Sequence, residues 1–400
     1  MTVQKHMVKL IVGILLIVTQ SCVSQNRSVP PGIDLTASKP KFGKALKGAQ
    51  ANIYWLGEQH GTRDNYKVAL AYFEYLLNEV GIDYLIIENS YLTEVLLNTY
   101  LQTGDEAYLV RAITNYSGTF YANQELKCYL ESIDQLWQQR PADKKFRFVA
   151  IDIEQTYRPS ETYIHDFLKR QGLREVFKRT IDFDSEKDNH SRRKYYALLQ
   201  SFLKERNLDN DTIPYMVKNM QHVLTAYIHG ETWDKVRDSL IYENFKRRDK
   251  ELHFKRNTGF AFWGTDHCYQ AANKKGVKWI ASLIGQHHPE LKQNSTVILY
   301  EDCAFMSHKG KFPKLSRFLF KKIDDNFIRH TFQNEPFQKL QDKRLLKKNK
   351  VSTITMWPVK DLPPDWDFVT KKMDGKRTRD YMDNVVLMVN SGHCTPFYAH

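Results

Sequence analysis

The chain has 400 residues, of which 42% are hydrophobic and 26% charged, and its formal net charge is +13. This balance is typical of a folded globular protein and excludes a disordered or collagen-like chain. The mean hydropathy of −0.55 and the absence of an 18-residue apolar run after residue 22 exclude a polytopic membrane protein. The basic excess favours anionic partners, but the sequence has no zinc-finger spacing, RNP-like stretch or basic-zipper pattern, so we predict no nucleic-acid binding.

Residues 1–21 are predicted to be a lipoprotein signal peptide. A positively charged start precedes the nine-residue apolar run Leu10–Val18, which is too short to span a bilayer. Ser21 directly before Cys22 resembles a bacterial lipoprotein cleavage site, which implies that Cys22 is lipidated; an ordinary signal peptide or an uncleaved anchor is the alternative. Residues 22–47 are polar and proline-containing and suit a flexible tether. We therefore expect a lipid-anchored protein of the cell envelope, at the outer membrane of a Gram-negative bacterium.

The remaining chain, residues 48–400, predicts an α/β domain with a mainly parallel sheet and flanking helices. Its short apolar runs read as buried strands: Asn52–Leu56, Tyr84–Ile87, Phe146–Ile151, Gly259–Trp263, Thr296–Tyr300 and Asn384–Val389. Between the early strands, three segments have helical patterns: Thr62–Val80, Tyr91–Ile113 and Gln124–Gln139. Alternation of strand and helix is typical of a parallel sheet with helices on both faces.

Two stretches interrupt this alternation. Residues of about 158–256 are charged and helix-rich, with breaks near 182–189 and 207–211, and we predict a helical insertion or cap over the carboxyl edge of the sheet. The Lys-rich stretch 308–350 is expected to be an irregular surface excursion. Four cysteines in the domain either pair or remain buried thiols: Cys128, Cys268, Cys303 and Cys394.

Polar residues follow four of the predicted strands. They are Glu58 and His60 after the first, Glu88 after the second, Asp152 and Glu154 after the third, and Asp266 and His267 after the fourth. Because the carboxyl ends of parallel strands meet at one edge, we expect these side chains to form one site.

Two kinds of chemistry fit this set of side chains. A histidine held by a carboxylate can take a proton from water. Two histidines and two carboxylates can instead hold a divalent metal that acidifies a bound water. Single residues also have structural explanations: Glu88 could cap the next helix, and Asp152 could pair with a buried arginine.

Several motifs in order resemble the erythromycin esterase-like proteins, which form one superfamily with ChaN-like haem-binding and TIKI-like proteins. The resemblance covers about residues 48–156 and 240–400. It rests on these segments: Leu56–Thr62 (LGEQHGT), Gly81–Glu88, Phe120–Glu125 (FYANQE), Val149–Glu154 (VAIDIE), Phe262–His267 (FWGTDH), and the last strand followed by Thr395 and Pro396.

The resemblance implies an α/β fold with a helical part over the cleft, and a motif histidine that activates water for ester hydrolysis. Carried over residue by residue, it assigns catalytic roles to Glu58, His60, Glu88 and His267. An arginine before the fourth strand matches Arg247 or Arg248; with Asp152, Glu154 and Asp266, Arg247 is predicted to bind substrate.

The spacing of the first motif departs from the esterase pattern, so the other members of the superfamily remain alternatives. In the esterases two residues separate the motif Glu and His, whereas here only Gln59 does. This spacing is similar to that of ChaN-type lipoproteins, which bind haem. The TIKI-like members are metal-dependent peptidases. Resemblance to them implies a divalent metal such as Mn, Zn or Co, held by Glu58, His60, Glu88 and His267. The sequence therefore predicts a membrane-tethered hydrolase of ester or amide bonds in a small molecule or peptide. The alternative is a lipoprotein that binds haem or another apolar ligand.

Overall fold

The computed structural model describes residues 32–38, 40–46, 50–155, 157–174, 189–208, 212–228, 233–273, 275–308, 321–332, 354–362 and 377–398. The predicted signal peptide and residues 22–31 of the predicted tether, Cys22 included, lie outside these residues. The prediction of a flexible tether is wrong for residues 32–38 and 40–46, because Ile33–Asp34 pairs with the sheet and Leu35, Phe42 and Leu46 are buried in the core. Within them, every helix is too short or too polar to cross a membrane.

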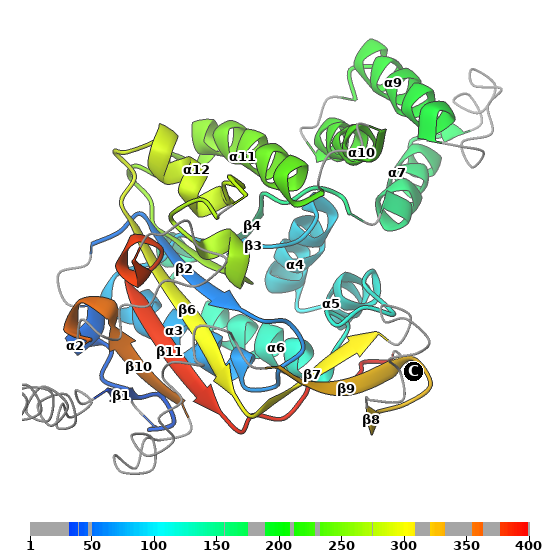
Figure 1. Cartoon of the computed structure of the whole chain (residues 1–400). Coiled ribbons are helices and arrows are strands. Elements are labelled where there is room, and N and C mark those ends of the chain that lie inside the picture. Colours follow the sequence, from blue (N-terminus) through cyan, green and yellow to red (C-terminus); the bar gives the residue numbers. More distant parts are fainter. Residues whose placement is uncertain are drawn as a thin grey trace, which may run out of the picture.

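An eight-stranded sheet forms the centre of the molecule and confirms the α/β class (Figure 1). Its order is β1-β10-β11-β6-β2-β5-β3-β4; the six strands from β11 to β4 are parallel, while β10 and β1 are antiparallel additions at one edge. The bounds are β1 Ile33–Asp34, β2 Ile53–Glu58, β3 Tyr84–Ile87, β4 Arg147–Ala150, β5 Gly259–Gly264, β6 Gln293–Glu301, β10 Ile354–Pro358 and β11 Asn384–Val389. All six predicted apolar runs lie in parallel strands of this sheet.

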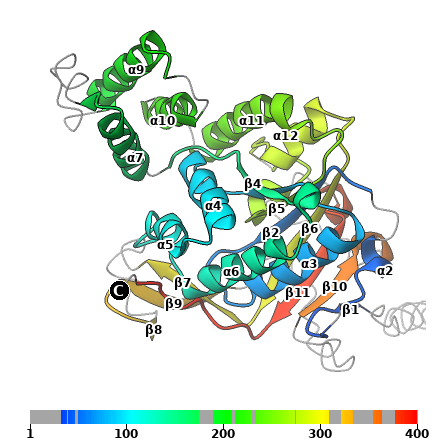
Figure 2. The ribbon, with the colours of Figure 1, turned by 180° about the vertical axis from the view of Figure 1, so that it is seen from behind.

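Both faces of the sheet are buried, which explains the continuous apolar runs. Tyr54 and Leu56 of β2 point to the face covered by α3 (Asn65–Glu79), α4 (Tyr91–Thr103) and α6 (Gln124–Gln138). The alternate residues Ile53 and Trp55 point to the face covered by α11 (Trp233–Leu252) and α12 (Ile280–His287). Figure 2 shows α3 and α6 lying across the first face. The short α2 (Gly43–Leu46) lies beside the β10 edge.

The predicted single helix Tyr91–Ile113 is wrong, because the chain forms two helices there. α4 ends at Gly104, which has a left-handed φ of 68° and donates its N–H to the Tyr100 carbonyl, and α5 (Glu106–Thr114) begins after it. Glycine adopts this conformation without the steric cost that other residues meet, so it ends the helix inside a continuous helical pattern.

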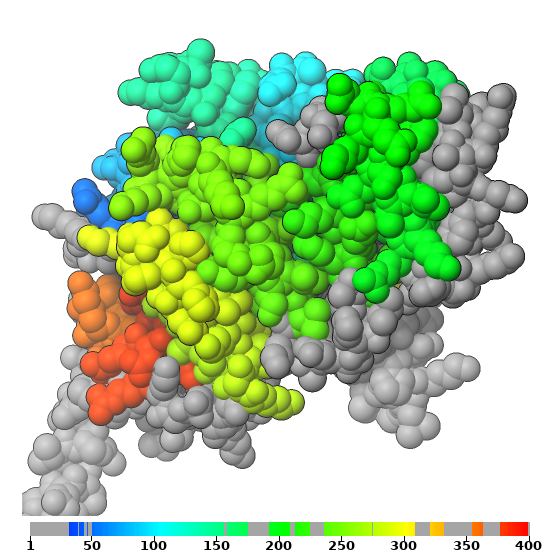
Figure 3. Space-filling view, turned by 90° about the horizontal axis from the view of Figure 1, so that it is seen from above, coloured from blue at the N-terminus to red at the C-terminus, as the bar shows by residue number. Residues whose placement is uncertain are grey.

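The predicted helical region contains α7 (Tyr157–Arg170), α9 (Asn189–Glu205), α10 (Thr212–Ile228) and α11. The first three form a group that packs on α4 and α11, and α11 itself lies on the sheet (Figure 1). From above, α11 and the α9–α10 pair form a continuous band across the molecule (Figure 3). The predicted breaks between helices fall largely outside the described residues.

The expectation of an irregular stretch at 308–350 is wrong in part. β7 (Cys303–His308), β9 (Phe327–Phe332) and β8 (Lys321–Lys322) form a small antiparallel sheet, and residues 309–320 and 333–350 lie outside the described part. β9 mixes buried Phe327 and Ile328 with exposed polar residues, so it lacks the continuous apolar run that marked the parallel strands. Cys128, Cys268, Cys303 and Cys394 are free thiols, and all but Cys128 are buried.

Candidate functional site

The strand order brings the predicted residues to one edge of the sheet. β2, β5, β3 and β4 are successive neighbours, so the segments that follow them lie side by side. Glu58 and His60 come from β2 and the loop after it, and His267 from the short helix η2 (Thr265–Cys268) after β5. Glu88 directly follows β3, and Asp152 follows β4.

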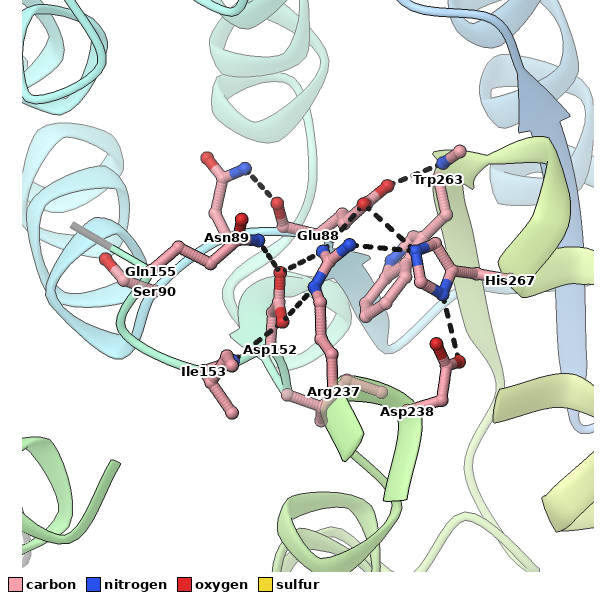
Figure 4. A network of polar contacts seen from close by, with 12 residues as sticks. Glu88, Asn89, Ser90, Asp152, Ile153, Gln155, Arg237, Asp238, Trp263 and His267 are labelled. Carbon is pink, nitrogen blue, oxygen red and sulfur yellow. Dashed lines mark hydrogen bonds and ion pairs between the residues drawn. The ribbon is translucent and has the colours of Figure 1, made fainter. Parts of the chain in front are cut away.

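Arg237 of α11 lies at the centre of a polar network that joins three of these residues (Figure 4). Its Nε and Nη2 donate to the two oxygens of Asp152 at 3.2 and 2.5 Å, and Nη2 also donates to Glu88 Oε1 at 2.8 Å. Its Nη1 lies 3.0 Å from His267 Nε2. The bidentate pair with buried Asp152 fixes the plane of the guanidinium against the sheet edge.

This arrangement corrects the predicted arginine. Arg247 stacks over the ring of Tyr215, with its Cζ 4.4 Å from the ring centroid, and Arg248 pairs with Glu94 at 2.6 Å. Neither arginine lies within the network. The arginine of the site is three turns earlier in the same helix, where it faces the sheet edge.

His267 lies between two carboxylates. Its Nδ1 is 2.9 Å from Asp238 Oδ1, and its Nε2 is 3.4 Å from Glu88 Oε1. Asp238 is fully buried and its Oδ1 also accepts the N–H of Ile280 at 2.8 Å, so it joins His267 to the start of α12. Asp238 was absent from the sequence prediction.

His60 is oriented by three neighbours. Its Nδ1 hydrogen-bonds Glu58 Oε1, its Nε2 is 3.0 Å from the Tyr121 hydroxyl, and its ring stacks on Phe120 with centroids 4.8 Å apart. Glu58 is held in turn by Asn65, whose Nδ2 donates to Oε2 at 2.5 Å. With a proton on Nδ1 for Glu58, the Nε2 lone pair is the acceptor that faces Tyr121.

Two glycines allow this geometry. A Cβ on Gly264 would lie 3.2 Å from His60 Nε2 and 3.3 Å from Glu88 Oε2, so only glycine lets these groups approach β5 without displacement. Gly61 has a φ of 95°, and a Cβ there would lie 2.4 Å from the Met306 carbonyl oxygen. The Gly61 carbonyl accepts the N–H of Met306 and of Cys394, which anchors the His60 loop to β7 and the C-terminal segment.

Two predicted substrate-binding residues lie outside this network. Glu154 is buried and accepts the N–H of Tyr91 at 2.9 Å and the hydroxyl of Ser160 at 2.6 Å, so it stabilises the start of α4. Asp266 lies in η2 with an exposed side chain. Tyr121 belonged to a motif of the family resemblance, but we assigned it no role from the sequence.

The charges of the network determine the protonation of its members. Burial alone would raise the pKa of Glu88, but His267, Arg237 and His60 outweigh it and lower the pKa to about 2. Burial would lower the pKa of His267, yet Asp238 and Glu88 raise it to about 9. Glu88 is therefore ionised, and His267 is an imidazolium at neutral pH. The contact of Arg237 Nη1 with His267 Nε2 at 3.0 Å is a hydrogen bond only when Nε2 is unprotonated; in the imidazolium, Nε2–H donates to Glu88 instead and the contact with Arg237 opens.

Burial and neighbouring charges also have opposite effects on the pKa values of Glu58 and His60. Burial raises the pKa of Glu58 although His60 lowers it. For His60, burial lowers the pKa, but Glu58 and Glu88 reverse the effect and the net pKa is raised. His60 thus carries a proton more readily than a free imidazole.

The residues do not fit either group that the resemblance implied. Across the described part of the chain, no three His, Cys, Asp or Glu side chains are placed to hold a metal ion. Instead the Arg237 guanidinium occupies the space between Glu88 and Asp152, where it would repel a second cation. The cavity at His60 has a volume of about 70 Å³, half that of a cavity of about 150 Å³ that accepts benzene, so a porphyrin does not fit it.

Comparison with known proteins shows that solved structures share this fold. No protein-family model matches the sequence, and no curated protein sequence matches it either. Three solved structures are similar. A succinoglycan biosynthesis protein has 12% identity and a TM-score of 0.65, covering 92% of this chain and 96% of its own. An erythromycin esterase variant in its open conformation has 12% identity and a TM-score of 0.63, covering 92% and 98%. A Bacillus cereus protein has 14% identity and a TM-score of 0.63, covering 93% and 97%.

At these identities the likeness shows a shared fold and leaves the activity open. It extends over nearly the whole length of each chain, so the helical region is part of the common architecture. A haem-bound ChaN of Campylobacter jejuni aligns with a TM-score of 0.29, which is too low to bear on this chain.

Proposed function

We propose that the protein is a hydrolase of ester or amide bonds in which His60 activates water. The observation that carries the proposal is the orientation of His60, whose Nδ1 is bound to Glu58 while Nε2 faces the site and is hydrogen-bonded by Tyr121. A histidine held by a carboxylate through one nitrogen, with the other nitrogen facing the site, is the usual arrangement of a general base. The resemblance of the motifs to the esterase-like proteins and the shared fold support the same reading.

The residues then divide the proton transfers between them. A water that replaces the Tyr121 hydroxyl at His60 Nε2 loses a proton to His60 and attacks the substrate carbonyl carbon. The Tyr121 hydroxyl, whose pKa is raised by burial, stays protonated and donates to the developing oxyanion. Protonated His267, held by Asp238, gives its proton to the leaving oxygen or nitrogen as the bond to the carbonyl carbon breaks.

Glu88 connects the two histidines and resets the site. Its Oε2 is 3.9 Å from His60 Nε2 and its Oε1 is 3.4 Å from His267 Nε2. The proton gained by His60 can therefore return to His267 along this carboxylate after each turnover. Arg237 does not take part in these transfers, and its role is to position Glu88 and neutralise Asp152.

The test is turnover of a panel of nitrophenyl esters and anilides by the purified protein. We expect ester hydrolysis that is lost in His60→Gln and retained in His287→Gln, which changes an exposed histidine of α12. Comparable turnover in the His60→Gln variant, or no turnover of any substrate by the wild type, would overturn the proposal. A shift of the Soret band on haem titration, combined with no hydrolysis, would favour the ligand-binding alternative.

We also propose that Cys22 carries a lipid that tethers the domain to the envelope membrane. The support is the sequence alone: an apolar run of nine residues, Ser21 and then Cys22. Mass spectrometry of the N-terminal peptide tests it. A diacyl-modified Cys22 supports the tether, and an unmodified N-terminus at any other residue contradicts it.

A further inference from the structure

A pocket opens beside His60 on the sheet face that α4, α5 and α6 cover. Glu58, His60, Glu88 and Tyr121 line one end of it. Most of the remaining wall is apolar and includes Leu85, Ile87, Ile113, Leu130 and Phe262; its polar members are Tyr66, Asn89, Thr93 and Tyr129. The pocket therefore runs from the proposed general base into the hydrophobic layer between the sheet and its helices.

One polar atom in this wall lacks a partner. Tyr129 of α6 is 5% exposed and lines the pocket, and its hydroxyl makes no hydrogen bond to any described residue. Its ring is tilted against the rings of Tyr66 and Phe262, with interplanar angles of 44° and 56°. A buried hydroxyl without a partner is unfavourable, so a wall that keeps one has a place for a ligand atom that accepts or donates a hydrogen bond.

We propose that this pocket binds the acyl group of the substrate, and that this group is a short chain bearing one oxygen. The inference rests on the proposed hydrolase function, because the carbonyl must lie at His60 for its tail to enter the pocket. The size sets the chain length: a cavity of about 150 Å³ accepts the six carbons of benzene, so about 70 Å³ accepts roughly three carbons beyond the carbonyl. The substrate class is thus an ester or amide of a butyryl-sized acid with a hydroxyl or keto oxygen that Tyr129 recognises.

The first test is a series of nitrophenyl esters with acetyl, butyryl, 3-hydroxybutyryl and octanoyl groups. Each methylene buried in the pocket raises kcat/KM about fourfold, so butyryl is expected to exceed acetyl by about 15-fold. Octanoyl is expected to fall below butyryl because the pocket is full, and 3-hydroxybutyryl to exceed butyryl.

Three variants change the pocket without touching the proton-transfer residues. Ala112→Val narrows it and is expected to lower the butyryl-to-acetyl ratio. Leu130→Ala enlarges it and is expected to raise the octanoyl-to-butyryl ratio. Tyr129→Phe is expected to lower the 3-hydroxybutyryl-to-butyryl ratio by about twofold to tenfold.

Matched controls lie on the other face of the sheet. Ala281→Val in α12 and Leu252→Ala in α11 change equally buried residues that do not line the pocket, and we expect them to leave the ratios unchanged. Because ratios are compared within each variant, a partial loss of folded protein does not alter them.

The outcomes separate this inference from the proposed function. Ester hydrolysis that is lost in His60→Gln but shows equal rates for acetyl, butyryl and octanoyl esters would overturn the acyl pocket and leave the hydrolase standing. Unchanged ratios in Ala112→Val and Tyr129→Phe would overturn it as well. If no ester is hydrolysed, calorimetric titration with butyrate and 3-hydroxybutyrate decides the pocket alone: binding that Ala112→Val weakens supports it, and no binding contradicts it.

Discussion

Removing the charge of Asp238 should move the alkaline limit of activity. Asp238 Oδ1 lies 2.9 Å from His267 Nδ1, and together with Glu88 it raises the pKa of His267 to about 9 although burial lowers it. Asparagine at this position keeps an oxygen for His267 and for the N–H of Ile280 but carries no charge. An opposite charge within hydrogen-bonding range shifts a pKa by about 1–3 units, so the pKa of His267 in Asp238→Asn should fall to about 6–8.

The assay is kcat/KM for ethyl butyrate as a function of pH, followed by chromatography of the released acid. An alkoxide leaving group needs a proton, so the wild type should lose activity near pH 9 as His267 deprotonates. In Asp238→Asn this limb should move to lower pH by about 1–3 units. Nitrophenoxide leaves without a proton, so nitrophenyl butyrate should lack the limb in both proteins.

A matched control lies in the same helix. Asp249 accepts the N–H of Phe254 at 3.0 Å, outside the network, and Asp249→Asn should keep the wild-type limb. An alkaline limb that stays in place in Asp238→Asn, with the fold intact by circular dichroism, would refute the assignment of His267 as the proton donor.

Three further predictions follow from the same network. Arg237→Met should lower the free energy of unfolding by about 3–5 kcal/mol in urea denaturation, because it leaves the carboxylates of Glu88 and Asp152 buried without their cation; a loss below about 1 kcal/mol would contradict this. The raised pKa of His267 stabilises the fold fully below about pH 6.5, and the stabilisation, at most about 3 kcal/mol, is lost as pH rises through about 9. His267→Gln should therefore remove the loss of stability between about pH 6.5 and 9, and an unchanged pH dependence of unfolding would contradict the raised pKa of His267. Ester hydrolysis should survive dialysis against EDTA, since the guanidinium occupies the cation position; activity that is lost and then restored by Mn, Zn or Co would show a metal site instead.

The residues at the sheet edge could be predicted from the sequence because the topology of a parallel sheet determines where they lie. Buried parallel strands leave continuous apolar runs, and the residues that follow such runs meet at one edge whatever the order of the strands. Glu58, His60, Glu88, Asp152 and His267 were found in this way. Glu154 followed the same strand as Asp152 but turned to the start of α4, a choice that local sequence does not reveal.

Arg237 and Asp238 could not be found in the same way. They lie in α11, where 11 of the 20 residues are charged, so each looks like part of a solvated helix face. Their burial depends on how α11 packs on α12 and the sheet edge, which is a contact between segments far apart in the chain. Arg247 and Arg248, which lie closer in sequence to the fourth strand than Arg237, were therefore the more plausible choices from the sequence, and both were wrong.

Titration of the His60 ring beside the pH dependence of kcat/KM tests the central claim most directly. Histidine labelled with ¹³C reports the pKa of His60 in the free protein by NMR, with His60→Gln used to assign its signal. If neutral His60 is the general base, the acid limb of kcat/KM has its midpoint at that pKa, above the ordinary 6.5 because of Glu58 and Glu88. A midpoint more than one pH unit away from the measured pKa, or an acid limb that persists in His60→Gln, would contradict the account.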